Sequence, residues 1–293
     1  MAANTRDIRR RIKSIKNTAQ ITKAMQMVAA AKMRKAQTAA LAGRPYSESI
    51  NRVLVDLREH TDVTLHPLLE VREVKNEIVL VISTDKGLCG ALNTNLLREL
   101  NPFNTETTGF ITAGRKAQQY VARTRRTLLA DFPLKDAPSL IETKVISKYL
   151  IEKFLAKEVD KVSIVFTSFK NTLVQKPTVR TLLPISPFDL PEADSSAKPT
   201  SGIDPENRFG YQYEPNAAEV LSTILPHYIH YQVYQMVLDA RASEHSARMV
   251  AMKGATDNAK QLIKDLTLEY NKVRQASITT ELLEITTAQM ALG

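Results

Sequence analysis

The chain has 293 residues, of which 43% are hydrophobic and 24% charged. These are ordinary globular values, and we find no apolar run as long as a membrane span or a signal-peptide core. The single cysteine, Cys89, excludes an intramolecular disulfide and favours a reducing compartment such as the cytosol, a matrix or a stroma.

The net charge of +9 is concentrated at the N-terminus. Residues 1–44 contain eleven Lys or Arg and one acid, Asp7, whereas the rest of the chain has 29 basic and 30 acidic residues. Such a basic element is expected to lie near an acidic partner. Nucleic acid is one alternative, but the basic side chains scatter around the element and lack the aromatic platforms of single-strand binders. We therefore favour solvated or protein-facing positions.

Residues 4–58 are predicted to form one long helix. Apolar or small residues recur at alternating spacings of four and three, which is the a/d seam of a coiled coil. The seam consists of Ile8, Ile12, Ile15, Ala19, Thr22, Gln26, Ala29, Met33, Ala36 and Ala40. Met25 lies off this seam. Pro45 is expected to kink or interrupt the helix near Gly43.

The middle of the chain alternates strands with helices. The run EIVLVIS at 77–83 is typical of a strand buried on both faces, and further strands are predicted at 109–114, 161–169 and 178–185. Helical patterns lie between them, at 88–100, 115–124 and 139–157. This alternation predicts a mostly parallel α/β sheet. Residues 186–215, rich in Pro, Ser, Asp and Gly, are expected to be a linker.

The C-terminal part, from about 216 to 290, is predicted to be a second long helix. Its heptad positions are Ala259, Leu262, Leu266, Val273, Ala276 and Leu283. A helix of this length extends about 110 Å, which is wider than an ordinary domain. We therefore expect an α/β protein in which the terminal helices, residues 1–58 and 216–293, form an antiparallel coiled coil. A Rossmann-like α/β head with its linker, residues 59–215, is inserted between them.

The turn after the first strand, STDKGLCGALN at 83–93, is a candidate nucleotide site. A dinucleotide fingerprint needs GxGxxG and a phosphate loop needs GxxxxGK followed by Ser or Thr, whereas this turn offers only Lys86, Gly87 and Gly90. A tight structural turn is the favoured interpretation. Cys89 near a helix start could be reactive, but a small packing residue is the simpler role.

The five histidines, His60, His66, His227, His230 and His245, show no metal-binding spacing. His227 and His230 are interleaved with tyrosines. We expect this segment to be an amphipathic helix that packs on the head.

Four segments resemble the gamma subunit family of F-type ATP synthases. They are IRRRIKSIKNTAQITKAMQMVAAAKMRKAQ at 8–37, STDKGLCGALN at 83–93, SFKNTLVQKPTVRTLLPI at 168–185, and SEHSARMVAMKGATDNAKQLI at 243–263 with RQASITTELLEI at 274–285. They follow the order of the family along nearly the whole chain. One departure is Ala288-Gln289, where the family usually has Gly-Ala.

The resemblance implies a non-catalytic central-stalk rotor subunit, with no cofactor or metal site and no catalytic residue. Its expected partners are the alpha and beta subunits of the catalytic ring, the epsilon subunit and the membrane c-ring, with one copy per complex and no nucleic acid. The expected location is the cytoplasmic face of a bacterial inner membrane, or the matrix or stromal face of an organelle membrane. Matching positions place beta-subunit contacts at Met25, Arg248, Gln275, Thr279 and Glu281.

Two rival functions remain at this point. A free-standing α/β nucleotide enzyme with coiled-coil arms would need a phosphate loop in the head. A basic coiled-coil nucleic-acid binder would show strongly salt-dependent affinity.

Overall fold

The computed structural model of the chain describes residues 2–60, 66–185 and 213–292. The chain divides into two units. Residues 1–31 and 248–293 form the helical unit, and residues 32–247 form the α/β unit. Most of the predicted linker lies outside the described residues. The predicted boundaries at 58/59 and 215/216 remain predictions.

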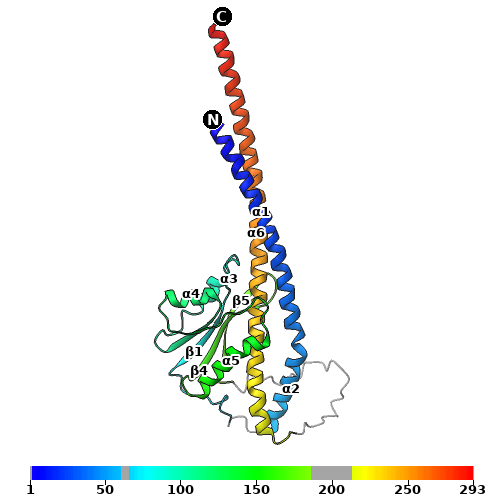
Figure 1. Cartoon of the computed structure of the whole chain (residues 1–293), viewed down its shortest axis with the longest axis vertical. Helices are drawn as coiled ribbons and strands as arrows, with labels where there is room; N and C mark the ends of the chain where they lie inside the picture. The colour runs from blue at the N-terminus through cyan, green and yellow to red at the C-terminus, as the bar shows by residue number, and fades with distance from the viewer. Residues whose placement is uncertain (1, 61–65, 186–212, 293) are drawn as a thin grey trace. The chain divides into compact units, whose positions relative to one another are not determined.

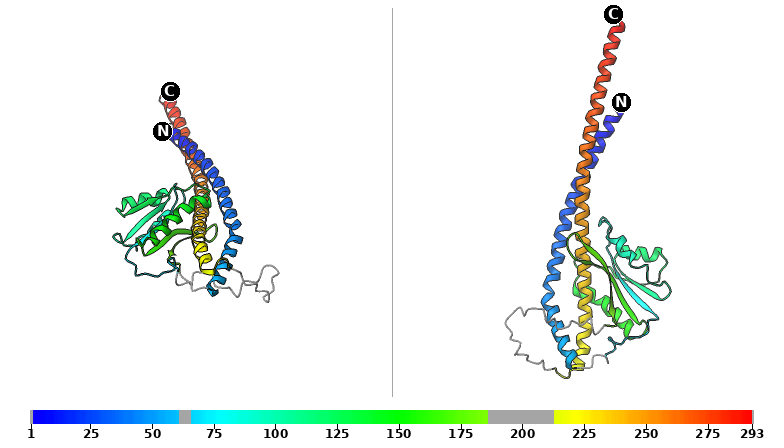
Figure 2. Two further views of the ribbon diagram at one scale, coloured as in Figure 1. Left: turned by 60° about the horizontal axis from the view of Figure 1, so that its bottom comes forward. Right: turned by 180° about the vertical axis from the view of Figure 1, so that it is seen from behind.

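Two helices pair in the helical unit. They are α1 (Ala2–Ala42) and α6 (Ala217–Leu292), whose other ends belong to the α/β unit. Both views in Figure 2 show them side by side in this unit. The hydroxyls of Thr22 and Thr256 lie 2.7 Å apart, and the guanidinium of Arg9 lies 5.4 Å from the centre of the Tyr270 ring. Since α1 positions rise as α6 positions fall, the pairing is antiparallel.

The predicted seam of α1 is the buried side of this helix. Ile8 and Ala29 are buried, with 4% and 1% of their surface exposed. Thr22, a polar position of the predicted seam, is also buried. Its hydroxyl has partners on both helices, the hydroxyl of Thr256 on α6 and the carbonyl of Ala19 on α1.

A break at Gly43 separates α1 from α2 (Arg44–His60). The proline that follows, Pro45, falls in the first turn of α2, where the missing N–H costs no helical bond. A Cβ at Gly43 would lie 2.5 Å from the hydroxyl oxygen of Tyr231, so the turn requires glycine for close approach. The predicted interruption is confirmed: residues 4–58 form two helices.

The five-stranded sheet of the α/β unit has the order β3-β2-β1-β4-β5. Its strands are β1 (Glu77–Ile82), β2 (Thr108–Ala113), β3 (Leu128–Asp131), β4 (Lys161–Phe169) and β5 (Gln175–Leu183). The first four run parallel, and β5 pairs antiparallel with β4. The mostly parallel α/β sheet is therefore confirmed. The edge strand β3 was not predicted.

Helices cover both faces of the sheet (Figure 1). Alternate residues of β1 point to opposite sides: Ile78, Leu80 and Ile82 belong to one core, and Val79 and Val81 to the other. The first core includes residues of α2, α5 (Leu140–Leu155) and α6. The second includes residues of α3 (Leu92–Arg98) and α4 (Arg115–Arg123). This double burial explains why the sequence of β1 is a continuous apolar run.

None of the helices in the described ranges combines the length and the hydropathy that a membrane crossing needs.

Candidate functional site

All five predicted contact residues lie on the two helices of the helical unit. Met25 on α1 is half-buried beside the seam, and Arg248 on α6 is also half-buried. Gln275, Thr279 and Glu281 are exposed on the distal part of α6. The hydroxyl of Thr279 donates to the backbone carbonyl of Gln275 at 2.9 Å, one helical turn earlier.

The distal part of α6 extends past its partner helix. The antiparallel register set by the Thr22–Thr256 and Arg9–Tyr270 contacts brings the start of α1 level with about residue 277 of α6. Every side chain from 281 to 290 is exposed. Among them, Leu282, Leu283 and Ile285 expose 58%, 60% and 59% of their surface. The predicted heptad position Leu283 therefore has no described α1 residue to pack against.

The turn after β1, the candidate nucleotide site, braces α4. Two of its residues accept hydrogen bonds from backbone N–H groups at the start of that helix. The Ser83 hydroxyl accepts from the N–H of Ala117 at 2.8 Å, and the Asp85 carboxylate accepts from the N–H of Arg115 at 3.1 Å. These bonds hold the turn against α4, as expected for a structural turn. The turn also lacks the phosphate-loop sequence.

Cys89 is part of the same packed turn. It is 3% exposed, and the Asn93 side-chain amide donates to its sulfur at 3.3 Å. The same amide donates to the Thr84 hydroxyl at 2.8 Å. The thiol is therefore buried, as predicted for a packing residue.

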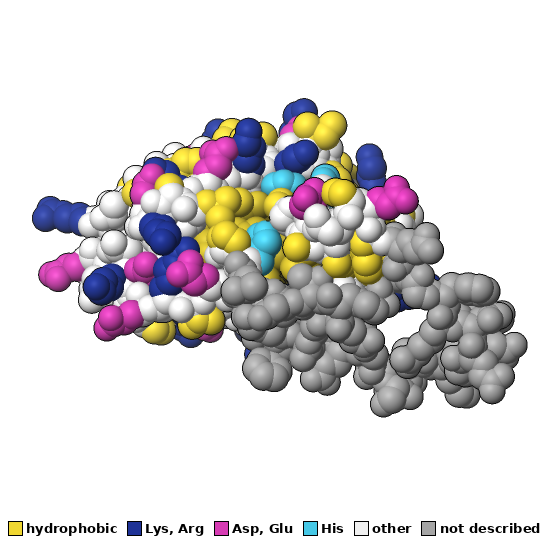
Figure 3. All heavy atoms as spheres, turned by 90° about the horizontal axis from the view of Figure 1, so that it is seen from below, with side chains coloured by type: hydrophobic (Ala, Val, Ile, Leu, Met, Phe, Trp, Pro, Cys, Tyr) yellow, Lys and Arg dark blue, Asp and Glu magenta, His cyan; other side chains and the backbone are white. Residues whose placement is uncertain are grey.

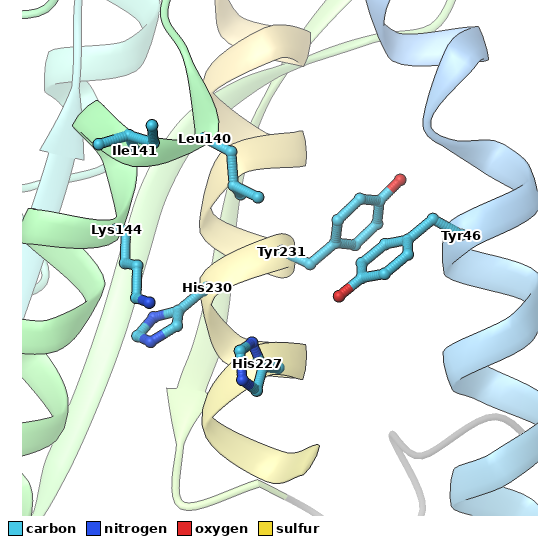
Figure 4. A pocket seen from close by; sticks show the side chains of 7 residues that line it. All are labelled: Tyr46, Leu140, Ile141, Lys144, His227, His230 and Tyr231. Carbon is cyan, nitrogen blue, oxygen red and sulfur yellow. The ribbon is translucent and has the colours of Figure 1, made fainter. Parts of the chain in front are cut away.

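A cavity of about 190 Å³ lies on the α/β unit, between α2, α5 and the first turns of α6 (Figure 4). Its lining is mostly apolar and aromatic, with imidazole and ammonium groups: Tyr46, Leu140, Ile141, Lys144, His227, His230 and Tyr231. In Figure 3, histidine side chains lie among hydrophobic ones on this side of the molecule. His227 and His230 thus sit on a helix that packs on the head, as predicted.

A buried serine–histidine pair adjoins this cavity. Ser147 Oγ lies 2.6 Å from His230 Nδ1. Burial, and then the nearby charges of Lys144 and His227, lower the pKa of His230 from 6.5 to about 4. An imidazole with so low a pKa is too weak a base to activate a serine at neutral pH. Ser147 is also fully buried, out of reach of a substrate. The pair therefore functions in packing.

Among the described residues, no three His, Cys, Asp or Glu side chains come together as a metal site would require.

Comparison with known proteins agrees with the geometry. Residues 4–292 match the family model described as ATP synthase. The chain is 52% identical to the ATP synthase gamma chain of Methylacidiphilum infernorum, with 99% of this chain and 100% of that chain covered. The chain belongs to the ATP synthase gamma chain family. The gamma chain of Opitutus terrae is 49% identical, with 99% of both chains covered.

Solved structures show the gamma-chain fold. A chain of the Euglena gracilis mitochondrial ATP synthase (OSCP/F1/c-ring, rotational state 3) matches with a TM-score of 0.67 and 21% identity, over 100% of this chain and 95% of that one. A chain of the Tetrahymena thermophila mitochondrial ATP synthase central stalk and c-ring matches with a TM-score of 0.59 and 22% identity, over 80% and 99%. The terminal helices with an inserted α/β domain are therefore the family architecture.

Sequence reasoning missed one polar cluster in this gamma-chain fold. Arg241, 3% exposed, and Glu244, 4% exposed, are buried on α6 and joined by a 2.8 Å ion pair. The only sequence signal was an Arg and a Glu three residues apart, a spacing that places them on one face of a helix.

Proposed function

We propose that the chain is the non-catalytic rotor subunit of an F-type ATP synthase. In this role it transmits torque between the ion-driven c-ring of the membrane and the catalytic ring of alpha and beta subunits. Catalysis takes place on the beta subunits. Membership of the gamma-chain family supports the proposal, as does the missing phosphate-loop sequence in the turn after β1.

The observation that carries the proposal is the exposed distal end of α6. The large apolar side chains Leu282, Leu283 and Ile285 are exposed there, although residues of these types are normally buried. Such exposed apolar surface is typical of a site that contacts another protein. The interior of the catalytic ring would cover this part of α6.

The five predicted contacts fit a ring better than a single flat surface. At about 100° per residue, Gln275 and Thr279 share one face of α6, whereas Glu281 points to nearly the opposite face. Met25 and Arg248 present further polar or flexible surface on both helices. We propose that all five touch beta subunits and that their role is mechanical.

Rotation requires contact without locking. Small Ala side chains permit close approach, and the flexible thioether of Met adapts to changing neighbours. The positive charge of residues 1–44 would meet acidic beta loops in turn as the shaft rotates. Because the shaft presents different sides to the three beta subunits, each would hold a different nucleotide affinity, and rotation would exchange these states.

The remaining partners follow from the family role. The α/β unit would bind the epsilon subunit and stand on the c-ring, with one copy of the chain per complex. We propose a peripheral position on the cytoplasmic face of a bacterial inner membrane. The matrix or stromal face of an organelle membrane is the alternative.

The proposal is tested by reassembling the complex with and without this chain. In inverted vesicles, the complete complex should pump ions when ATP is added. The complex without this chain should not couple hydrolysis to pumping. Equal pumping in both preparations would rule the proposal out.

A pair of variants tests the contact role of Met25. Met25→Lys should leave assembly nearly intact, because no fully buried seam residue is lost. Its ammonium could form a charge-assisted bond of about 1.5–3 kcal/mol to an acidic beta loop in one rotary state, which would hinder the next step. The matched control is Ala29→Lys, which places a charge at a position only 1% exposed. It should reduce assembly first, whereas Met25→Lys should reduce the number of ions pumped per ATP.

A further inference from the structure

Residues 241–246 of α6 are buried although most of them are polar. Arg241, Ser243, Glu244, His245 and Ser246 expose between 0% and 4% of their surface. Earlier turns of the same helix contact the sheet through apolar residues such as Ile229, Val233 and Val237. Burial of polar groups is costly unless their hydrogen bonds are satisfied. The partners of this segment therefore show what it does.

Arg241 binds three parts of the fold. Its Nη1 donates to Glu244 at 2.8 Å, and its Nη2 donates to the carbonyl of Leu134, after β3, at 2.9 Å. Nη2 also lies 3.6 Å from the carboxylate of Asp85, in the turn after β1. The other oxygen of that carboxylate accepts the first N–H of α4, from Arg115. One guanidinium thus connects α6 with two loops at the carboxyl edge of the sheet.

Two serines extend the same attachment. Ser243 donates to the carbonyl of Thr167 on β4 at 3.0 Å, and Ser246 donates to the carbonyl of Thr172 at 2.8 Å. We call Arg241, Ser243, Glu244 and Ser246 the clasp. Apolar packing sets which face of a helix meets the sheet, but its contacts have no preferred direction. Hydrogen bonds between defined donors and acceptors add a directional constraint on the rotation of the helix about its axis.

The clasp occupies the last turns of α6 in the α/β unit, immediately before Arg248, where the helix passes into the helical unit. We propose that Arg241 is a positioning residue for torque transmission: it fixes the rotational setting of α6 against the sheet, so that the α/β unit and α6 turn together. This inference rests on the proposed rotor function.

The deciding variant is the double substitution Arg241→Met with Glu244→Met. It removes both buried charges and retains side chains of similar volume, a change that buried ion pairs often tolerate without loss of stability. A bead is attached to the α/β unit through Arg123→Cys, since Arg123 is exposed and Cys89, the only other cysteine, is buried. The complete complex is then compared for assembly, melting temperature, ATP hydrolysis, ions pumped per ATP and the angular variance of the bead between steps.

We expect normal assembly and hydrolysis, a larger angular variance and fewer ions pumped per ATP. Arg241→Lys keeps the charge but lacks the fork that reaches Glu244 and Leu134 together, so it should give a smaller change in the same direction. The control removes the exposed pair Lys148 and Glu152 on α5, 3.7 Å apart, by the same substitutions to Met. It should leave the variance unchanged.

If the double variant has the same angular variance of the bead and the same number of ions pumped per ATP as the wild type, the inference is wrong and Arg241 is a purely structural residue. If the double variant does not assemble, Arg241→Lys decides by the same comparison. A wild-type complex whose bead does not rotate would instead contradict the rotor function itself, so the two failures are distinguishable.

Discussion

Acidification should destabilise the chain through His230. Burial and the neighbouring charges of Lys144 and His227 lower the pKa of this imidazole from 6.5 to about 4 in the folded protein. Between those two pH values the unfolded chain binds a proton that the folded chain does not. The free energy of unfolding should therefore fall as the pH drops through this window. Above pH 6.5 the imidazole is neutral in both states and contributes no slope.

The magnitude follows from the shift. A pKa lowered from 6.5 to about 4 corresponds to at most about 3 kcal/mol. The ring borders an open cavity, so solvent screens part of the effect, and we expect about 1–2 kcal/mol. His230→Asn removes the titrating group and keeps a polar atom for Ser147. Other groups also contribute on acidification, such as Asp136, whose pKa is lowered by the hydrogen bond from Lys32. They are common to both chains and cancel in the comparison.

The assay is urea unfolding of the full chain and of His230→Asn, followed by circular dichroism at pH values from 7 to 4. Wild type should lose about 1–2 kcal/mol more than the variant across the window. His227→Asn, an exposed histidine of the same cavity, is the matched control. It should keep most of the wild-type loss, because the charge of His227 is the smallest of the three causes that lower the pKa of His230. Parallel curves for wild type and His230→Asn would refute the argument that burial keeps this ring neutral.

Three other predictions concern separate features. Gly43→Ala should lower the free energy of unfolding, because its methyl group would lie 2.5 Å from the Tyr231 hydroxyl oxygen. Gly254→Ala, in open space within α6, should raise the free energy of unfolding by about 0.5–1 kcal/mol. A more stable Gly43→Ala than Gly254→Ala would contradict the close approach at Gly43. Equilibrium dialysis of the isolated chain should show no stoichiometric ATP binding, because the turn after β1 lacks a phosphate loop; binding abolished by Lys86→Ala would contradict this. Dithiol reductants should leave the activity of the complex unchanged, since Cys89 is the only cysteine; an effect that Cys89→Ser removes would contradict this.

The central strand was predictable because both of its faces are buried, which leaves a continuous apolar signature in EIVLVIS. The edge strand β3 was not, because Leu128 and Leu129 expose 37% and 45% of their surface and give neither a buried run nor an alternation. The pattern of apolar residues in a sequence indicates which positions are buried. An exposed edge strand therefore has no clear pattern by which it could be predicted.

Residue spacing predicted the seam of α1, and Pro45 predicted the break that precedes it. Contacts between residues far apart in the sequence could not be predicted in this way. Arg241 and Leu134 are 107 residues apart, and no sequence period connects them. The heptad position Leu283 was expected in a seam but is exposed, and no described residue of α1 lies level with it. A heptad repeat predicts an apolar stripe and leaves open which partner covers it.

The most direct test of the rotor function is to watch this chain move. The alpha and beta subunits are fixed to a surface with this chain assembled among them, and a bead is attached to the α/β unit through Arg123→Cys. On addition of ATP the account predicts continuous rotation of the bead in one direction, which stops when ATP is exhausted. Steady ATP hydrolysis by the same complexes with a stationary bead would contradict it.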